Sequence, residues 1–119
     1  MTSVQQMIPT RGDVFMVDLD PTVGHEQGGH RPALVVSDDS LNRSPAGIVT
    51  ILPITGTSRG IPAHVKVSAP EGGLSKASVV MVDQIRTISR RRIVRRLGAV
   101  SPSTMGQVDD RLKLVLGLT

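Results

Sequence analysis

The sequence contains no cysteine and almost no aromatic residues. Cys, Trp and Tyr are all absent from its 119 residues, and Phe15 is the single aromatic side chain. The lack of cysteine excludes disulfides, thiol catalysis and thiolate metal sites. With one aromatic residue, the core must be built from Val, Ile, Leu, Met and Ala, and we expect Phe15 to be buried in it. A bound nucleic acid would then find few rings on which to stack its bases.

Long apolar runs are missing as well. Hydrophobic residues make up 39% of the chain, but no stretch approaches the roughly 20 apolar residues of a membrane span. The first ten residues, MTSVQQMIPT, do not join a basic leader to an apolar segment, so we expect no export. We predict a soluble, cytoplasmic protein without membrane contact, in which residues 1–10 are a loose extension and residues 11–119 form a single domain.

Arginine dominates the basic residues. Only three of the 14 basic side chains are lysines, and the formal net charge is +4 with a sequence pI of about 10.7. Guanidinium groups bind phosphates through paired hydrogen bonds and stack on bases, so the composition favours an anionic partner. Net charge alone is equally consistent with a solvated basic surface, because charge governs association and not fold.

Residues 12–37 predict a strand, a polar loop and a second strand. Apolar residues recur at every second position from Phe15 to Leu19, the period of a β-strand. Ala33–Val36 is an unbroken apolar run, and Asp20–Arg31 between them holds two histidines, a glutamate, a glutamine and three glycines. This connection is too polar and too long for a plain hairpin turn. We therefore expect a functional site there.

The rest of the chain predicts short strands, glycine-rich turns and one terminal helix. Strands are predicted at Ile48–Ile54, His64–Val67 and Val79–Val82, and Pro53 indicates a sheet edge or a strand terminus. Ser101 followed by proline is typical of a helix start, and apolar residues at positions 105, 108, 112 and 115 form one helical face. Six strands and this helix predict a small, mostly antiparallel barrel or curled sheet.

Residues 86–96 contain six arginines. Apolar residues at positions 88, 93, 94 and 97 can supply a buried side. We therefore interpret residues 90–96 chiefly as a turn and a strand with a charged solvent face, and a phosphate-binding surface is the alternative.

Motifs of metal-dependent and nucleotide-dependent hydrolysis are missing. The three histidines form no HxxH or HExxH pattern, and no glycine-rich stretch precedes a helix with a following lysine, as a P-loop requires. Metal-free acid–base and electrostatic chemistry on a phosphodiester remains. RNA permits this chemistry because its own 2′-hydroxyl can act as the nucleophile.

Six short motifs occur in order along the chain: GDV at 12–14, DLDPT at 18–22, GHEQG at 24–28, RPA at 31–33, PIT at 53–55 and DQIRTI at 83–88. Their order and spacing resemble the MazF/PemK family, the sequence-specific endoribonuclease toxins of bacterial toxin–antitoxin pairs. The resemblance implies an SH3-like barrel and a homodimer. It also implies cleavage of single-stranded mRNA without metal or other cofactor, a 2′,3′-cyclic phosphate product, and inhibition by a cognate antitoxin protein.

Cleavage by the 2′-hydroxyl needs a base, an acid and a cation beside the phosphate. Arg31 suits the cationic role, because a guanidinium is a poor proton donor. The Thr55 hydroxyl is too weakly acidic to act unaided as a base, so we interpret it as a hydrogen-bonding group that positions the phosphate or the nucleophile. The resemblance places Arg31 and Thr55 at catalytic positions.

The proton carriers are predicted among His25, Glu26 and Asp83. Histidine titrates closest to neutral pH, and His25 lies in a glycine-flanked loop, although an exposed loop histidine without a role is an equal alternative. In some relatives, residues matching His25 and Asp83 take part in the reaction, with an arginine two residues before the aspartate. Met81 occupies that position here, which shifts the burden of charge stabilisation to Arg31.

Base recognition should fall to polar loop residues, because aromatic rings are lacking. The glutamate and glutamine of the loop could instead fasten it to backbone amides, and we interpret His30 and His64 as surface residues. The predicted substrate contacts are Glu26, Gln27, Thr57, Ser58, Gln84 and Arg86.

Two other functions stay open at this point. One is a toxin of the same fold that inhibits a protein target such as DNA gyrase without cutting RNA, and the other is a non-catalytic barrel that binds nucleic acid. The presence of Arg31 and Thr55 beside Glu26 and Gln27 favours the endoribonuclease.

Overall fold

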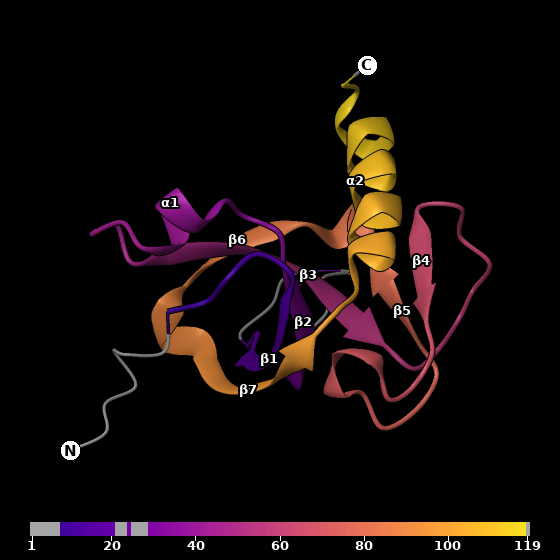
Figure 1. Ribbon diagram of the computed structural model, residues 1–119, viewed down its shortest axis with the longest axis horizontal. Helices are drawn as coiled ribbons and strands as arrows, with labels where there is room; N and C mark the ends of the chain where they lie inside the picture. The colour runs from indigo at the N-terminus through magenta and orange to yellow at the C-terminus, as the bar shows by residue number, and fades with distance from the viewer. Residues whose placement is uncertain (1–7, 21–23, 25–28, 119) are drawn as a thin grey trace.

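The computed structural model describes residues 8–20, 24 and 29–118. Seven strands and two α-helices occur in these ranges, with short 3-10 turns between some of them (Figure 1). The strands are β1 (Asp13–Asp18), β2 (His30–Val35), β3 (Ile48–Thr55), β4 (His64–Val67), β5 (Ser78–Met81), β6 (Arg86–Ser89) and β7 (Ile93–Ala99). The helices are α1 (Asp39–Asn42) and α2 (Pro102–Leu116), and the 3-10 turns are η2 (Glu71–Gly73), η3 (Val82–Gln84) and η4 (Arg90–Arg92).

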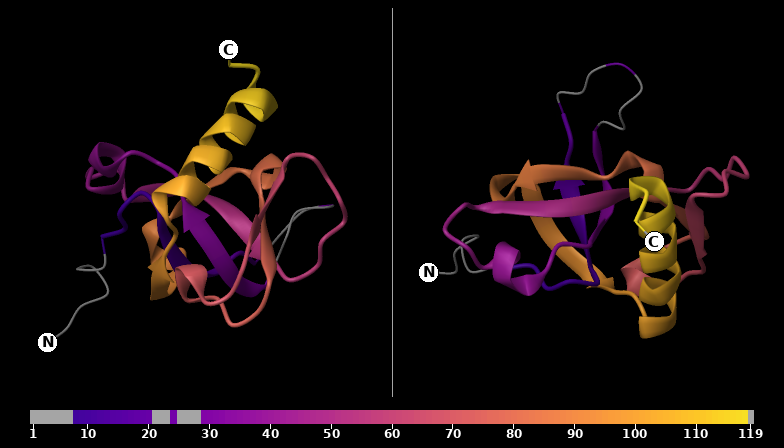
Figure 2. Two further views of the ribbon diagram at one scale, coloured as in Figure 1. Left: turned by 45° about the vertical axis from the view of Figure 1, so that its right-hand side comes forward. Right: turned by 90° about the horizontal axis from the view of Figure 1, so that it is seen from above.

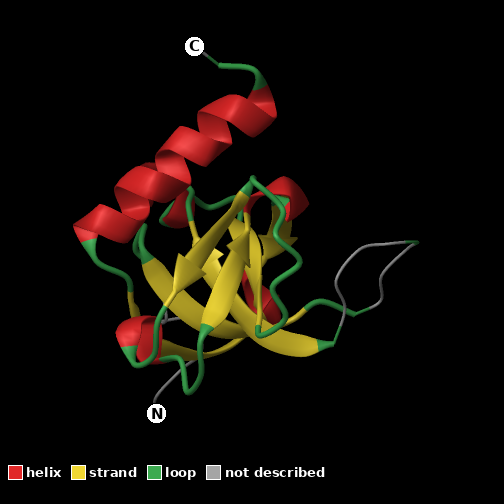
Figure 3. Ribbon diagram, turned by 90° about the vertical axis from the view of Figure 1, so that its right-hand side faces the viewer, coloured by secondary structure: helices red, strands yellow, loops and turns green. Residues whose placement is uncertain are grey.

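All the strand pairs are antiparallel. Pairing runs from β7 through β1, β2 and β3 to β6, and η4 leads from β6 back to β7, so five strands curl around one part of the core. The second half of β3 pairs with β5, which pairs in turn with β4. The predicted mostly antiparallel fold with a C-terminal helix is confirmed (Figure 3).

The core lies on both faces of β1, β2 and β3. Neighbouring residues of each strand enter different halves, because successive side chains of a strand point to opposite faces. Phe15, 2% exposed, belongs to the half that β6 and β7 enclose, as expected for the single aromatic residue. Val14 belongs to the other half, where Val108 of α2 is fully buried. Burial on both faces makes β1–β3 the central layer of the core.

Pro53 lies in the middle of the sheet, and its predicted place at an edge or strand terminus was wrong. β3 has partners on both sides, and Pro53 itself pairs with Ala33 of β2. On its other side β3 pairs with β6 up to Ile51 and with β5 from Ile54. Proline is tolerated because it falls where β3 changes partner, so its missing N–H interrupts no continuous ladder.

The arginine-rich segment forms two strands where one was predicted. Ser89 caps the intervening turn, because its hydroxyl accepts a hydrogen bond from the backbone N–H of Arg91 at 3.2 Å. The turn changes which residues face inward. Ile93 is 4% exposed, whereas Val94, predicted to be buried, is 48% exposed.

Helix α2 begins where the sequence predicted. Ser101 is the N-cap and accepts a hydrogen bond from the Thr104 amide at 3.2 Å. The helix packs beside β4 and η3, whereas α1 lies beside β3, away from α2 (Figure 1, Figure 2). Its C-terminal turns extend away from the sheet, and Leu114 and Leu116 are 69% and 51% exposed. None of the helices in the described ranges has the length and apolar character needed to cross a bilayer.

Candidate active site

Arg31 and Thr55, the two residues predicted to carry the reaction, line the same cavity. Its volume is about 460 Å³, and we call it the cationic cavity. Strands β1, β2, β3 and β7 form its walls together with the segment from η2 to β5. Its polar and charged lining residues are Arg31, Thr55, Thr57, Ser75, Lys76, Ser78 and Arg95.

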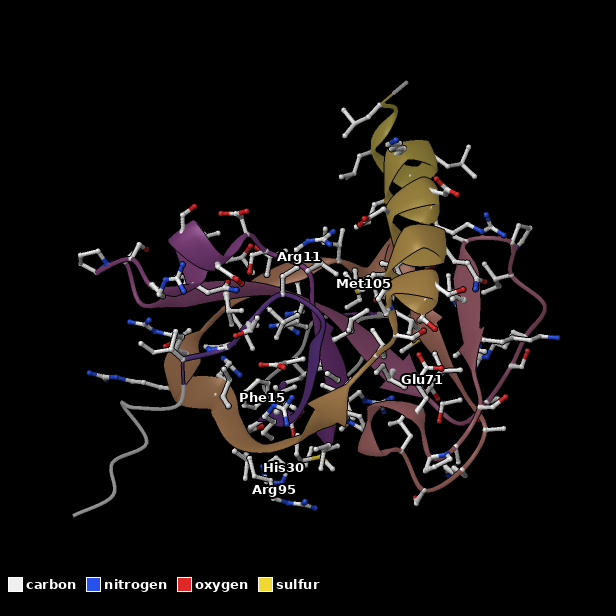
Figure 4. All side chains as sticks on the ribbon, in the orientation of Figure 1. Arg11, Phe15, His30, Glu71, Arg95 and Met105 are labelled. Atoms are coloured by element: carbon white, nitrogen blue, oxygen red, sulfur yellow. The ribbon has the colours of Figure 1, made fainter. Side chains whose placement is uncertain are left out.

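Two arginines from different strands reach this cavity, and the pairing of β1 with β7 shifts register between Met16 and Val17, beside both of them. Val17 of β1 pairs with Arg31 of β2, and the preceding residue, Met16, pairs with Arg95 of β7. The central strand β1 thus carries one cation on each side. Figure 4 shows Arg95 at the same end of the molecule as His30, the first residue of β2.

Lys76 supplies a third cation from the loop before β5. Its side chain lies across Gly56, because a Cβ added at Gly56 would be 2.5 Å from Lys76 Cε and 2.8 Å from Nζ. No Asp or Glu lines the cationic cavity within the described part of the chain. Sequence reasoning missed Lys76 and Arg95, since a loop lysine and one arginine among many carry no distinguishing local pattern. Strand pairing brings Arg95 to this cavity, and the path of the loop before β5 brings Lys76.

A backbone contact fixes the loop that carries Lys76. Gly73 has φ +72°, and a Cβ there would lie 2.0 Å from the carbonyl oxygen of Leu97. A Cβ at Gly98 would in turn lie 2.8 Å from backbone atoms of Gly72 and Gly73. Glycine is required at 73 for both its conformation and this close approach. The η2 turn therefore docks directly on the main chain of β7.

A second cavity of about 340 Å³ adjoins the first, and we call it the Asp83 cavity. Thr55 and Thr57 line both cavities, so the end of β3 and the residues after it form their shared wall. Arg31 lines only the first and Asp83 only the second. The residues lining the second cavity are Thr55, Thr57, Arg59, Ile61, His64, Met81, Asp83 and Gln84.

His64 is buried in this second cavity, and its predicted surface position was wrong. Its side chain is 7% exposed, and its Nε2 atom lies 2.9 Å from Oδ1 of Asp83. His64 pairs with Met81 across β4 and β5, and the η3 turn after β5 brings Asp83 back over the imidazole. His30, by contrast, is a surface residue as predicted, with 65% of its side chain exposed.

The structure separates the remaining predicted residues into three groups. Gln84 and Thr57 line the Asp83 cavity with Asp83 itself. Ser58 and Arg86 line neither cavity, and Arg86 Nη1 is buried without a hydrogen bond to any described residue. The predictions for His25, Glu26 and Gln27 fall outside the described residues.

The structure argues against a serine-hydrolase site and a metal site within the described part of the chain. Residues 56–60, GTSRG, match the GxSxG spacing of serine hydrolases, but they connect β3 to β4 and do not lead into a helix. Ser58 is therefore not on a nucleophile elbow. In the described ranges, no three His, Asp or Glu side chains are grouped to hold a metal ion.

Three of the six arginines in residues 86–96 bind other parts of the fold, a role that the sequence interpretation of a charged solvent face did not include. Arg90 Nη1 donates to the carbonyl oxygen of Asn42 at 2.6 Å, and Arg92 Nη1 donates to that of Asp18 at 3.2 Å. Arg96 forms an ion pair with Asp13 at 3.0 Å. These arginines hold η4 and β7 against the rest of the sheet, and Arg95 is the member of the segment that lines a cavity.

Known proteins are similar to this chain in sequence and fold. The family described as "PemK-like, MazF-like toxin of type II toxin-antitoxin system" matches residues 10–116 of this chain. Endoribonuclease EndoA of Bacillus subtilis is 40% identical over 113 residues, which are 94% of this chain and 97% of that protein. A crystal structure of MazF from Deinococcus radiodurans has a TM-score of 0.84 at 31% identity and covers 94% of this chain and 99% of its own. A mycobacterial endoribonuclease in complex with its cognate antitoxin has a TM-score of 0.78 at 32% identity, over 93% and 97%.

The fold and the cationic cavity define the class: a small curled-sheet protein with a strongly cationic cavity at the end of β3. The chain belongs to the PemK-like, MazF-like family, the toxins of type II toxin–antitoxin systems. It is an endoribonuclease of the MazF type.

Proposed function

We propose that this toxin cleaves single-stranded mRNA at specific sequences, without a metal ion, by attack of the substrate's own 2′-hydroxyl. The observation that carries the proposal is the meeting of Arg31 and Thr55 in one cavity that also holds Lys76 and Arg95. A phosphodiester in this cavity would be surrounded by cations and hydroxyl groups. The reaction gains charge on the phosphoryl oxygens as it approaches its transition state, and fixed cations stabilise that charge.

Arg31 is the principal group on the scissile phosphate. Its guanidinium donates hydrogen bonds to the phosphoryl oxygens, and the Thr55 hydroxyl helps to position the phosphate or the 2′-hydroxyl. The 2′-oxygen forms a bond to phosphorus as the bond to the 5′-oxygen breaks. The 2′-hydroxyl proton goes to a base, and the departing 5′-oxygen takes a proton from an acid. The products are a 2′,3′-cyclic phosphate and a free 5′-hydroxyl.

The proton carriers remain a prediction. Asp83 and Arg31 line different cavities, which share the wall formed by Thr55 and Thr57. This separation favours binding of a neighbouring part of the substrate by Asp83 over proton transfer at the scissile phosphate. His25, in the loop between β1 and β2, is then the stronger candidate for proton transfer. Its test is the His25→Ala variant, which should lose cleavage and keep RNA binding.

Lys76 and Arg95 extend the phosphate-binding surface beyond the scissile group. They come from different elements, the loop before β5 and strand β7. A single strand crossing the cavity would meet them with its flanking phosphates, and such contacts hold a strand in register without reading its sequence.

The cationic cavity also suggests how the toxin meets its protein partners. We propose that an antitoxin protein inhibits the enzyme by laying an acidic, disordered segment along the cationic cavity, where it folds on binding and excludes RNA. The solved mycobacterial relative bound to its cognate antitoxin supports this proposal. The toxin would act in the cytoplasm, where mRNA is translated. We also propose a homodimer in which the Asp20–Arg31 loops of the two subunits flank a shared RNA groove.

The decisive experiment incubates pure protein with RNA in EDTA. Cleavage that persists in EDTA and leaves 2′,3′-cyclic phosphate ends supports the proposal. Activity that vanishes with EDTA and returns with Mg²⁺ would refute metal independence. RNA that stays intact in every buffer, with tight binding to a protein such as DNA gyrase, would instead support a toxin of the same fold with a protein target.

A further inference from the structure

Asp83 is held by a buried histidine. Its Oδ1 lies 2.9 Å from Nε2 of His64, whose side chain is 7% exposed. An ionised carboxylate only accepts hydrogen bonds, so the proton of this bond resides on Nε2 and the imidazole is the donor. The other ring nitrogen, Nδ1, is buried and has no hydrogen-bond partner among the described residues.

This geometry prevents the ring nitrogens of His64 from binding the substrate, although the ring lines the cavity. One ring nitrogen is occupied by Asp83 and the other is covered by protein. His64 is therefore a positioning residue, which fixes the rotamer of Asp83. The Asp83 side chain is 38% exposed, and its Oδ2 atom takes no hydrogen bond from any described residue. The result is a fixed acceptor facing the Asp83 cavity.

The walls around this acceptor combine apolar and polar groups. Ile61 and Met81 supply apolar surface, and Thr57, Arg59 and Gln84 supply further hydrogen-bonding groups. Thr55, on the shared wall, sets the Asp83 cavity directly beside the cationic cavity, where the proposed function puts the scissile phosphate. A nucleotide next to the cleaved bond can therefore place its base in the Asp83 cavity while its phosphate lies in the cationic cavity.

We propose that the Asp83 cavity binds a nucleobase that carries an exocyclic amino group, and that it rejects uracil. This inference rests on the proposed endoribonuclease function. Cytosine, adenine and guanine each present amino hydrogens that a carboxylate accepts, and carboxylate recognition of the cytosine 4-amino group is well established. Uracil presents a carbonyl oxygen at the matching position, and two facing acceptors repel. His64 sharpens this choice by preventing Asp83 from rotating away.

The test compares RNA substrates that differ only by cytosine or uracil at one position beside the cleaved bond. Cleavage of a randomised RNA pool by the wild type first identifies that position. We expect the wild type to favour cytosine over uracil by about tenfold or more, the discrimination typical of a good base contact. Asp83→Asn should abolish or reverse the preference, because an amide can donate to the uracil oxygen.

Two variants of His64 separate positioning from mere structure. His64→Gln can keep a donor near Asp83 and should retain most of the preference, whereas His64→Phe fills the space without a donor and should lose it. Asp110→Asn makes the same charge change on an exposed position of α2 and should behave as the wild type.

The same oligonucleotides with a 2′-O-methyl group at the cleaved nucleotide measure affinity without cleavage. Equal affinity for cytosine and uracil in the wild type would overturn the inference even if cleavage is normal. A uniform loss of cleavage by Asp83→Asn on all substrates, with unchanged affinities, would make Asp83 a proton carrier and also overturn it. Failure of the wild type to cut any RNA would count against the proposed function, while the affinities would still test the cavity.

Discussion

The carboxylate of Glu71 caps the first turn of α2 through Thr104. Its Oε2 atom accepts a hydrogen bond from the Thr104 hydroxyl at 2.6 Å and another from the backbone N–H of Ser101 at 2.9 Å. Glu71 belongs to η2, so one side chain links the turn docked on β7 to the start of the terminal helix (Figure 4). A carboxylate at a helix N-terminus is also favoured by the helix dipole.

This link should make the protein sensitive to acid. The hydrogen bond from Thr104 and then that from the Ser101 amide lower the pKa of Glu71 below its ordinary value. A lowered pKa in the folded state stabilises the protein above the unfolded pKa of about 4.3, and that stability is lost as the pH falls through the folded value. We expect Glu71→Gln to be less stable than the wild type at pH 7 and the difference to shrink below about pH 4. Urea unfolding at several pH values measures it, and a constant difference would contradict the assignment.

Removing the guanidinium of Arg31 should abolish most of the activity without unfolding the protein. Arg31→Ala should lose about 2.7–4 kcal/mol of transition-state stabilisation, the typical effect of deleting one such donor. The measurement is kcat/KM on an RNA of defined sequence, with circular dichroism as a check of folding. Arg91→Ala is the matched control, because Arg91 is exposed and lines neither cavity. Near wild-type cleavage by Arg31→Ala would remove Arg31 from the site.

Lys76 and Arg95 should govern RNA affinity and its dependence on salt. Each contact to a single-strand phosphate contributes a slope of about 0.7 in a plot of log affinity against log salt concentration. Lys76→Ala and Arg95→Ala should each lower affinity for a non-cleavable RNA and reduce the slope by about that amount. Arg91→Ala again serves as the control for loss of one positive charge. Unchanged slopes in both variants would show that neither side chain touches the RNA backbone.

Adding a methyl group at two glycines should have opposite effects on stability. Gly73→Ala forces a Cβ against the Leu97 carbonyl oxygen at a positive φ and should destabilise the protein by about 1–3 kcal/mol. Gly106→Ala meets nothing within 4 Å in the middle of α2 and should stabilise it by up to about 1 kcal/mol. Thermal unfolding of the two variants gives the comparison. A neutral Gly73→Ala would mean that η2 can move away from β7.

The exposed end of α2 should be an interface between two copies of the chain. Leu114 and Leu118 are 69% and 59% exposed, and a twofold contact would cover the same patch on both subunits. Light scattering at micromolar concentration should report twice the chain mass of 12.6 kDa. Replacing both leucines by glutamate should yield monomers with reduced activity. A wild-type monomer with full activity would refute the shared groove.

Local patterns predicted the elements, and long-range pairing decided the site. The period of two in β1 and the cap at Ser101 are properties of adjacent residues, so the sequence contained them. The family resemblance implied catalytic positions for both Arg31 and Thr55. The structure places the two side chains in one cavity. His64 was missed because burial of a histidine depends on a partner 19 positions away. No periodicity reports such a contact.

The same limit explains the other differences. Pro53 is excluded from a central strand by its missing N–H, unless that strand changes partner at the proline, which only the pairing of β3 with β6 and then β5 reveals. The division of residues 86–99 depends on one capping hydroxyl, at Ser89. Lys76 and Arg95 became site residues only when the sheet brought them to Arg31.

The main-chain contact between Gly73 and β7 anchors the loop that lines the cationic cavity, so the atoms that anchor the loop differ from those that line the cavity. The loop that follows starts from a backbone contact at the two glycines, whereas the side chains of Ser75 and Lys76 line the cavity. We therefore expect the loop to keep its path when those side chains are exchanged. A toxin built in this way can change how tightly it holds the RNA backbone by changing its lining alone, and its frame stays intact.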